Sequence, residues 1–387
     1  MFIYLFILRL LKLFTFSSKK DRKRKKILAT ATFYSDNWIK TLIMPIAENI
    51  HVENVCIVAS DKVPVMNNVT AVYPPKWLKS LIGSSFSRML TYLIFSFKYR
   101  PDIYIGFHLL FNGLMAGFLS NLFNKNSIYI CGGGVREVEG GGYRTENKLF
   151  SKIGNPDELL EKQLLESLNY LDYIVTMGSS AKDYFENIPI KTSVCVNPGG
   201  VDDTIYSPDN SMKEFDIILI GRLSKVKRVE RLIEANSIVR DKLGKPFKIV
   251  IVGSGPEHHY LQDLSKNNNL ERDITFAGWQ DNIDNWLKRS KLFALTSESE
   301  GLSQAMLQAL MCGLPAVVSD VGDLSDAVRD KYNGLLVKNQ TAEEFAEAFI
   351  QILSSANHYN EYSKNAIESS REYNIVNSSK KWNLILG

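Results

Sequence analysis

Two cations that follow an apolar run in the second half of the chain could bind a diphosphate. Arg222 comes directly after residues 216–221, and Lys227 lies five residues later, where the next helix should begin. If the run is a strand of a parallel sheet, both cations emerge at its carboxyl end, where a guanidinium fork and an ammonium group can hold one pyrophosphate. A solvated basic turn is the alternative interpretation, because Lys225 and Arg228 are adjacent.

Residues 292–319 have the pattern of a strand, a turn and a helix that together create an anion site. The turn carries Glu300 and Gly301, and the helix should begin near Ser303. Backbone amides at a helix start bind anions. Gln308 lies five residues further, about 7.5 Å along the axis at ~1.5 Å per residue. A nucleotide phosphate on the helix start would bring its ribose to Gln308, and Glu300 would face the sugar beyond it.

The first half of the chain offers candidates for the acceptor side of a site. A histidine ends the apolar run 102–108, although a structural histidine is the competing interpretation. A glycine-rich run, 131–147, follows the next predicted strand; it could bring backbone close to a ligand, or it could be a surface loop. The candidate acceptor contacts are His108, Gly133, Gly134, Arg136, Glu137 and Arg144.

Residues 2–16 predict an amphipathic helix, and a basic run follows it up to position 26. Arg9, Lys12 and Thr15 recur at every third position among Leu, Ile and Phe. The apolar part is shorter than the ~20 residues of a spanning helix, and its charges come after it, unlike those of a cleavable signal. We expect residues 1–26 to lie at the cytoplasmic face of a membrane. A helix packed on the body and a truncated anchor are the alternatives.

Residues 77–100 form a second aromatic and basic stretch, which opens with Trp77 and carries cations from Arg88 to Arg100. The pattern favours a core helix with a charged outer stripe, and contact with lipid is the alternative.

Composition and charge limit the classes of protein that remain. The chain has 387 residues and 45% hydrophobic residues, which favours two domains over one core. Residues 1–26 carry nine cations and one acid, a net +8, so the rest of the chain carries −4 of the total +4. Such a body is not built to bind nucleic acid. No metal site is predicted, since the cysteines are too far apart for one: Cys56, Cys131, Cys195 and Cys312.

From residue 27 onward, short apolar runs alternate with segments of helical period. Apolar strands that are each followed by a helix form parallel sheets covered on both faces. Two such sets in series predict an α/β fold of two doubly wound, Rossmann-like domains facing each other across a cleft. A linker is expected near residues 197–209, where Pro198, Gly199 and Gly200 cluster.

The segment 216–337 resembles the donor-binding half of the family-4 glycosyltransferases, which have the two-domain GT-B fold and include many surface-polysaccharide enzymes of bacteria and archaea. Gly221-Arg222 with Lys227 is similar to that family's diphosphate-binding pair, and Glu300-Gly301 to the first Glu of its Glu-x7-Glu signature. Other similar segments are Cys312-Gly313-Leu314-Pro315, Val252-Gly253-Ser254-Gly255-Pro256-Glu257, Phe276-Ala277-Gly278-Trp279 and Asn197-Pro198-Gly199-Gly200-Val201-Asp202. The first half of the chain is similar only in architecture.

The resemblance implies a retaining transferase without an obligatory metal or cofactor. Arg222 and Lys227 would stabilise the leaving diphosphate, and Glu300 would position the donor sugar. The donor is expected to be a UDP-sugar rather than a GDP-sugar, and the acceptor a lipid-linked or nascent polysaccharide. The residues expected to bind the donor are Gly221, Gly253, Gly278, Trp279, Gly301, Leu302, Ser303 and Gln308.

The resemblance also assigns the domains. Residues 27–198 would form the acceptor-side domain and residues 199–370 the nucleotide-sugar domain, and a helix within 371–387 would cross back to the first. The chain departs from the family pattern at Gln308, which replaces the second Glu, and in residues 32–38, which lack a Gly-Gly-x-Glu loop. A non-catalytic nucleotide-binding or scaffold subunit is a rival because of Gln308 and because the run 131–147 lacks the histidine that relatives often place after the preceding strand. A sugar-nucleotide epimerase is a less favoured rival.

Overall fold

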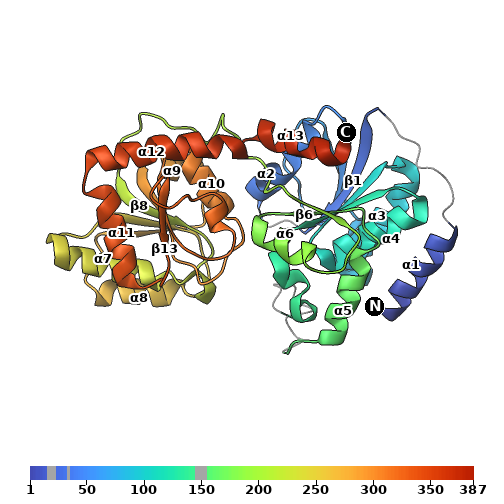
Figure 1. Cartoon of the computed structure of the whole chain (residues 1–387), viewed down its shortest axis with the longest axis horizontal. Coiled ribbons are helices and arrows are strands. Elements are labelled where there is room, and N and C mark those ends of the chain that lie inside the picture. The colour runs from blue at the N-terminus through green and yellow to red at the C-terminus, as the bar shows by residue number, and fades with distance from the viewer. Residues whose placement is uncertain (15–22, 33–34, 144–154) are drawn as a thin grey trace. The chain divides into compact units, whose positions relative to one another are not determined.

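The computed structural model describes residues 1–14, 23–32, 35–143 and 155–387. These residues divide into two compact units (Figure 1): unit 1 is Met1–Gly200 with Ile375–Gly387, and unit 2 is Val201–Asn374. Arg144 and much of the basic run after position 14 lie outside the described residues. Each unit is built on a parallel sheet, which confirms the predicted class of two α/β domains.

Unit 1 contains a seven-stranded sheet in the order β3-β2-β1-β4-β5-β6-β7, and all neighbouring strands run parallel. β-Branched and aliphatic residues make the central strands, which are buried on both faces. The strands are β1 (Lys25–Ala31), β2 (Val52–Ala59), β3 (Val69–Val72), β4 (Ile103–Phe107), β5 (Asn126–Cys131), β6 (Tyr173–Thr176) and β7 (Ser193–Val196). Every strand of this sheet except β3 is predicted by an apolar run in the sequence, namely 27–32, 54–59, 102–108, 127–132, 173–177 and 193–197.

Seven α-helices lie in the described part of unit 1. α3 and α4 pack on one face of the sheet, where Tyr92 and Leu119 join Leu28 and Val58 in one core cluster. The helices are α1 (Phe2–Phe14), α2 (Asp36–Ala47), α3 (Lys76–Tyr99), α4 (Leu114–Phe123), α5 (Glu158–Leu168), α6 (Ser179–Glu186) and α13 (Ile375–Leu386). None of the helices in the described ranges is long and apolar enough to cross a membrane.

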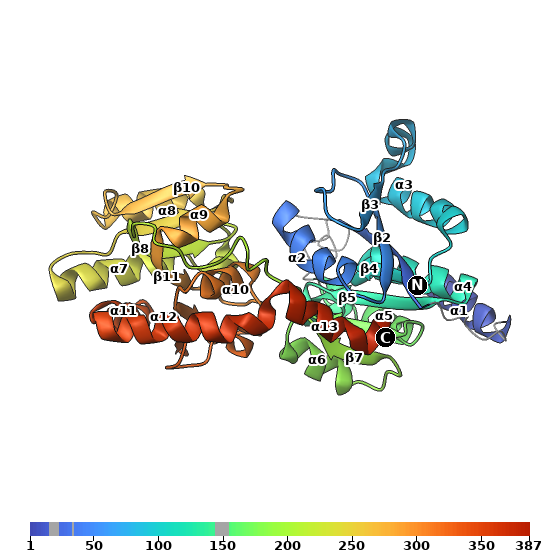
Figure 2. The same ribbon diagram turned by 90° about the horizontal axis from the view of Figure 1, so that it is seen from above.

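The last helix, α13, completes unit 1 although it follows unit 2 in the sequence. Figure 2 shows it beside α2, against which it packs. The amide of Asn49 donates to the backbone oxygen of Ser379 at 2.7 Å and to Asn383 at 2.9 Å. Trp382 is buried, so it anchors the helix by packing.

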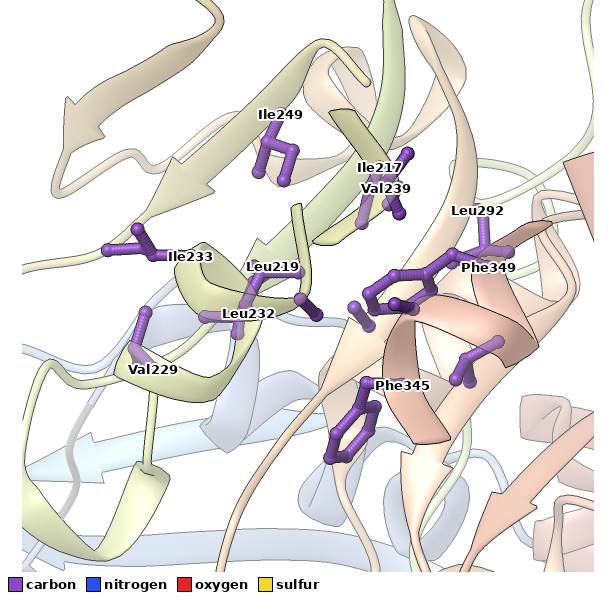
Figure 3. Close-up of a cluster of buried hydrophobic side chains, with 14 of the residues drawn as sticks. Ile217, Leu219, Val229, Leu232, Ile233, Val239, Ile249, Leu292, Phe345 and Phe349 are labelled. Carbon is purple, nitrogen blue, oxygen red and sulfur yellow. The ribbon is translucent and has the colours of Figure 1, made fainter. Parts of the chain in front are cut away.

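Unit 2 repeats the same topology with six parallel strands in the order β10-β9-β8-β11-β12-β13. Its core combines β8 with α7 and α11, and Figure 3 shows Phe345 and Phe349 among the aliphatic side chains. The strands are β8 (Phe215–Ile220), β9 (Ile249–Val252), β10 (Ile274–Gly278), β11 (Ser290–Leu295), β12 (Ala316–Ser319) and β13 (Gly334–Val337). The helices are α7 (Glu230–Leu243), α8 (His258–Asn267), α9 (Ile283–Lys288), α10 (Gln304–Met311), α11 (Ala342–Leu353) and α12 (Ala356–Ser370).

Candidate active site

The cation Lys227 and the carboxylate Glu300 lie at the switch point of the unit 2 sheet. β8 has β9 on one side and β11 on the other, so the chain leaves β8 and β11 in opposite directions along the sheet. Lys227 is in the short turn after β8, and Glu300 is in the loop after β11. In doubly wound sheets, ligands bind outside the carboxyl ends of the strands at this point.

Hydrogen bonds to backbone oxygens hold the two loops together. The hydroxyl of Thr296 donates to the backbone oxygen of Arg228 at 2.9 Å, and the backbone amide of Glu298 donates to the backbone oxygen of Val226 at 2.8 Å. Lys227 Nζ then donates to Glu300 Oε1, and Ser297 Oγ donates to the same oxygen at 2.6 Å. The pair is mostly shielded from solvent, with side-chain exposures of 23% and 11%. The structure therefore brings together two of the three predicted catalytic residues.

A glycine supports the loop that carries Glu300. Gly322 has a φ of 57°, and a Cβ atom built on it would lie 1.8 Å from the backbone oxygen of Glu300. Only a residue without a side chain allows this close approach. The position of the Glu300 carboxylate thus depends on a residue 22 positions further along the chain.

Helix α10 begins beside this loop and carries an unsatisfied polar group. Ser303 is its N-cap, and its hydroxyl accepts from the amide of Met306 at 3.4 Å. Gln308 is 1% exposed, and among the described residues neither its Nε2 nor its Oε1 has a hydrogen-bond partner. A buried amide without partners is costly, because it loses its bonds to water. Hydroxyl groups of a ligand both donate and accept, so they would form hydrogen bonds with both atoms.

The other donor-side candidates lie around the ends of the strands. Arg222 is exposed directly after β8, and Gly221 borders Lys227, whose Cε would be 3.9 Å from an added Cβ. The amide of Gly253 donates to the backbone oxygen of Gly278 at 2.8 Å, which joins the ends of β9 and β10. Trp279 is largely exposed and donates to Asp281 at 3.1 Å. Gly301 is exposed, and Leu302 is buried.

A second polar cluster lies at the switch point of the unit 1 sheet, between β1 and β4. His108 follows β4, and its Nδ1 is 2.7 Å from Glu137 Oε1. Trp38, from the loop and helix after β1, stacks on the imidazole with ring centroids 5.9 Å apart and planes 2° from parallel. The contact between Trp38 and His108 was not predicted. The signal in the sequence that could have indicated it is an aromatic residue in the segment that follows the first predicted strand.

The carboxylate of Glu137, which was expected to contact a ligand, is buried and accepts hydrogen bonds on both oxygens. Oε1 also accepts from the amide of Gly133 at 2.5 Å, and Oε2 accepts from the amide of Leu109 at 2.7 Å and the hydroxyl of Tyr129 at 2.8 Å. Burial alone would raise the pKa of Glu137, but the charge and hydrogen bond of His108, with the bonds from Leu109 and Tyr129, bring it below its usual value.

The glycine-rich run makes this packing possible. An added Cβ on Gly133 would lie 2.9 Å from Glu137 Oε1, and one on Gly132 would lie 3.0 Å from the imidazole of His108. Residues 132–137 of the run therefore pack tightly over the pair. Gly134 and Arg136 are partly exposed beside it, within a short 3-10 turn.

Among the residues that the structure describes, no three or more His, Cys, Asp or Glu side chains are arranged to hold a metal ion.

Comparison with known proteins finds a matching family model and relatives of similar sequence. Residues 202–369 match the family model described as Glycosyl transferases group 1. N-acetyl-alpha-D-glucosaminyl L-malate synthase of Bacillus anthracis is 30% identical over 159 residues, which are 41% of this chain and 41% of the relative. A UDP-Gal:alpha-D-GlcNAc-diphosphoundecaprenol alpha-1,3-galactosyltransferase of Escherichia coli is 30% identical over 182 residues, or 42% and 46% of the two chains. The chain spans about half the length of these curated relatives.

Solved structures are similar over nearly the whole chain. Sucrose-phosphate synthase of Thermosynechococcus elongatus has a TM-score of 0.74 at 17% identity and covers 94% of this chain and 98% of its own. Anabaena Alr3699/HepE, solved in complex with UDP, has a TM-score of 0.70 at 15% identity and covers 93% and 99%. At these identities the likeness shows the fold, two parallel-sheet α/β domains as in GT-B proteins. Residues 202–369, nearly all of unit 2, thus match the glycosyl transferases group 1 domain.

Proposed function

We propose that the protein is a glycosyltransferase that moves a sugar from a UDP-sugar to a lipid-linked or nascent polysaccharide acceptor with retention of anomeric configuration. The observation that carries the proposal is the Lys227–Glu300 ion pair at the switch point of a sheet that matches a glycosyl transferases group 1 model. Relatives named for undecaprenol-linked acceptors support the acceptor class.

In this proposal Lys227 stabilises the negative charge that grows on the leaving diphosphate. An ammonium group has three donors, so Lys227 can keep its bond to Glu300 and still donate to phosphate oxygens. Arg222 supplies the second cation from the end of β8. Glu300 is fixed through Oε1 by Lys227 and Ser297, and its Oε2 is assigned to the hydroxyls of the donor sugar.

The reaction breaks the bond between the anomeric carbon and the diphosphate oxygen and forms a bond from the acceptor oxygen on the same face. The acceptor proton passes to the leaving diphosphate. The amide of Gln308 binds the ribose hydroxyls, which would satisfy its two buried atoms. His108 and its neighbours at the unit 1 switch point are assigned to the acceptor side. No metal ion, cofactor or protein nucleophile is part of this proposal.

We assign the protein to the cytoplasmic face of a membrane, with α1 as one point of contact. The cationic side of α1 faces the protein: Arg9 pairs with Glu166, and Lys12 Nζ donates to the backbone oxygen of Asn169 at 3.1 Å. Its apolar side is exposed, with Phe2 69% and Ile3 77% accessible. Flotation with anionic vesicles should fall when residues 1–26 are removed, and equal flotation of both forms would contradict the assignment.

Calorimetry with UDP and donor hydrolysis together test the enzymatic proposal. The wild type should bind UDP and hydrolyse one donor of a panel slowly, and Lys227→Ala should lower that turnover about 100-fold or more. Glu300→Ala should also lower turnover. Glu347→Ala is a matched control, since Glu347 forms an exposed pair with Lys242 at 3.1 Å. Tight UDP binding without turnover on any donor, unchanged by Glu300→Ala, would favour the scaffold alternative.

A further inference from the structure

Helix α3 bends sharply at Gly83, which has a φ of 79° and a ψ of 165°, so it consists of two helical parts. The second part, residues 84–99, has its polarity inverted, with polar side chains toward the protein and apolar ones toward solvent. Its buried residues are Ser87, Arg88, Thr91, Tyr92 and Ser96. Its large exposed apolar residues recur every three or four positions and are Phe86 (63%), Leu90 (37%), Ile94 (60%) and Phe97 (62%). The first part adds exposed Trp77 and Leu81. This outcome differs from the charged outer stripe that the sequence analysis favoured. A helix that faces water on its outer side has the opposite arrangement.

Hydrogen bonds fix the inverted orientation of α3. Arg88 donates to Asn112 Oδ1 at 3.0 Å and to Ser60 Oγ at 3.2 Å. The hydroxyl of Tyr92 lies 3.0 Å from the backbone oxygen of Leu28 in β1. Turning the helix to bury its apolar side would break these bonds and leave buried polar groups unsatisfied. The apolar surface is therefore a fixed feature of unit 1.

This surface continues beyond α3. Phe97 of α3 contacts Phe123 of α4 with ring centroids 5.0 Å apart, and Tyr4 of α1 donates to the backbone oxygen of Leu114 in α4 at 2.8 Å. Figures 1 and 2 both show α3, α4 and α1 along one side of unit 1. Of the 24 large exposed apolar residues in the described ranges, five lie on α1, seven on α3 and one on α4. The concentration is typical of an interaction surface.

The charges around this surface indicate what covers it. Neither α1 nor α3 contains an acidic residue, although the chain after residue 26 carries a net charge of −4. Lys76 and Lys98 are exposed near the two ends of α3. A surface of aromatic and aliphatic side chains flanked by cations is complementary to anionic lipid. A second copy of the chain would place cations opposite cations if the same surfaces met in a symmetric pair.

We propose that α3 lies on an anionic lipid bilayer as a second contact, in addition to that of residues 1–26. The inference deepens the proposed membrane association and does not depend on the transfer reaction. Phe86 and Ile94 would enter the region between the headgroups and the acyl chains, while Lys76 and Lys98 would lie at the headgroups. Residues 84–99 of α3, which follow the bend at Gly83, would then lie along the membrane without crossing it.

Flotation of the full chain with phosphatidylcholine vesicles, with and without phosphatidylglycerol, tests this proposal. The double variant Phe86→Ser/Ile94→Ser should lose about tenfold or more in vesicle partition. Lys76→Ala/Lys98→Ala should lose binding several-fold only when phosphatidylglycerol is present, and high salt should remove that difference. Leu384→Ser is the matched control, because Leu384 is 81% exposed on α13 of the same unit and should change nothing.

Other outcomes would overturn the inference. One is a Phe86→Ser/Ile94→Ser variant that floats like the wild type. Another is a wild type that is dimeric by light scattering while this variant is monomeric, which would make the surface an interface between copies. UDP binding and circular dichroism of the variant report its folding. If the wild type does not bind UDP, the proposed function is refuted, and the flotation result still decides the membrane proposal.

Discussion

The substitution Glu137→Gln tests whether the buried carboxylate holds His108 and the glycine-rich run in place. The change keeps the size of the side chain and removes its charge. Each carboxylate oxygen of Glu137 accepts from one backbone amide, that of Gly133 at Oε1 and that of Leu109 at Oε2. Whichever way the glutamine amide is turned, its NH2 group must face one of these donors.

The expected cost follows from those contacts. One buried backbone amide loses its acceptor, which costs about 1–3 kcal/mol. The remaining bonds no longer end on a charge, which removes about 1 kcal/mol more, because bonds to charged groups are worth about 1.5–3 kcal/mol and neutral ones about 1 kcal/mol. We therefore expect Glu137→Gln to lower the free energy of unfolding of unit 1 by about 2–4 kcal/mol.

Urea denaturation at pH 7, followed by tryptophan fluorescence, measures this change, since Trp38 stacks on His108. Glu139→Gln is the matched control, because Glu139 is exposed two positions away. Glu139→Gln should change the free energy of unfolding by no more than about 0.5 kcal/mol. A Glu137→Gln variant as stable as this control would refute the reasoning.

The same carboxylate predicts a pH dependence. The pKa of Glu137 is lowered from its usual value of about 4.5 in the folded protein. A group of this kind stabilises the fold above its unfolded-state pKa and loses that contribution as the pH falls through its folded-state pKa. The difference in free energy of unfolding between wild type and Glu137→Gln should thus be largest at neutral pH and become smaller below about pH 4.5. A difference that grows on acidification would contradict this sign.

Three further predictions concern other parts of the fold. Gly322→Ala should lower donor hydrolysis more than UDP affinity, because its Cβ would displace the loop of Glu300; equal kcat in wild type and variant would refute this. Trp382→Ala should lower the free energy of unfolding of unit 1 by about 3–5 kcal/mol, measured by urea denaturation, and leave UDP binding unchanged. Burial raises the pKa of Cys56 to about 11 and of Cys312 to about 12, so a maleimide at pH 8 should modify both thiols much faster in urea than in the folded protein.

Strong local patterns made most of the fold predictable. Strands such as β8 and β9 are short runs of Ile, Val and Leu, each followed by a helix, and this alternation determines parallel sheets. β3 was missed because it has only four residues, with Thr70 between its apolar ones, and lies partly exposed at the edge of the sheet. Its position depends on pairing with β2, which a local pattern does not contain.

The sequence did not reveal which residues of the candidate site contact each other when they lie far apart along the chain. Lys227 and Glu300 were each predicted in the site, but their ion pair forms across 73 positions. Glu137 was expected to contact a ligand because the glycine-rich run around it could bring its backbone close to one. Its burial depends on donors from the segment after β4, from β5 and from a glycine turn, which only the folded sheet brings together. The inverted faces of α3 depend in the same way on Asn112 and Leu28, far away in sequence.

The place of α13 in unit 1 also orders the events of biosynthesis. Unit 2 is one continuous stretch of chain, so it can fold as soon as residues 201–374 have left the ribosome. Unit 1 begins first but finishes last, since residues 375–387, with buried Trp382, are translated after all of unit 2. The nascent chain therefore carries an unfinished unit 1, with the docking face for α13 open, until residues 375–387 have left the ribosome. Loss of these residues would damage the first unit and spare the second.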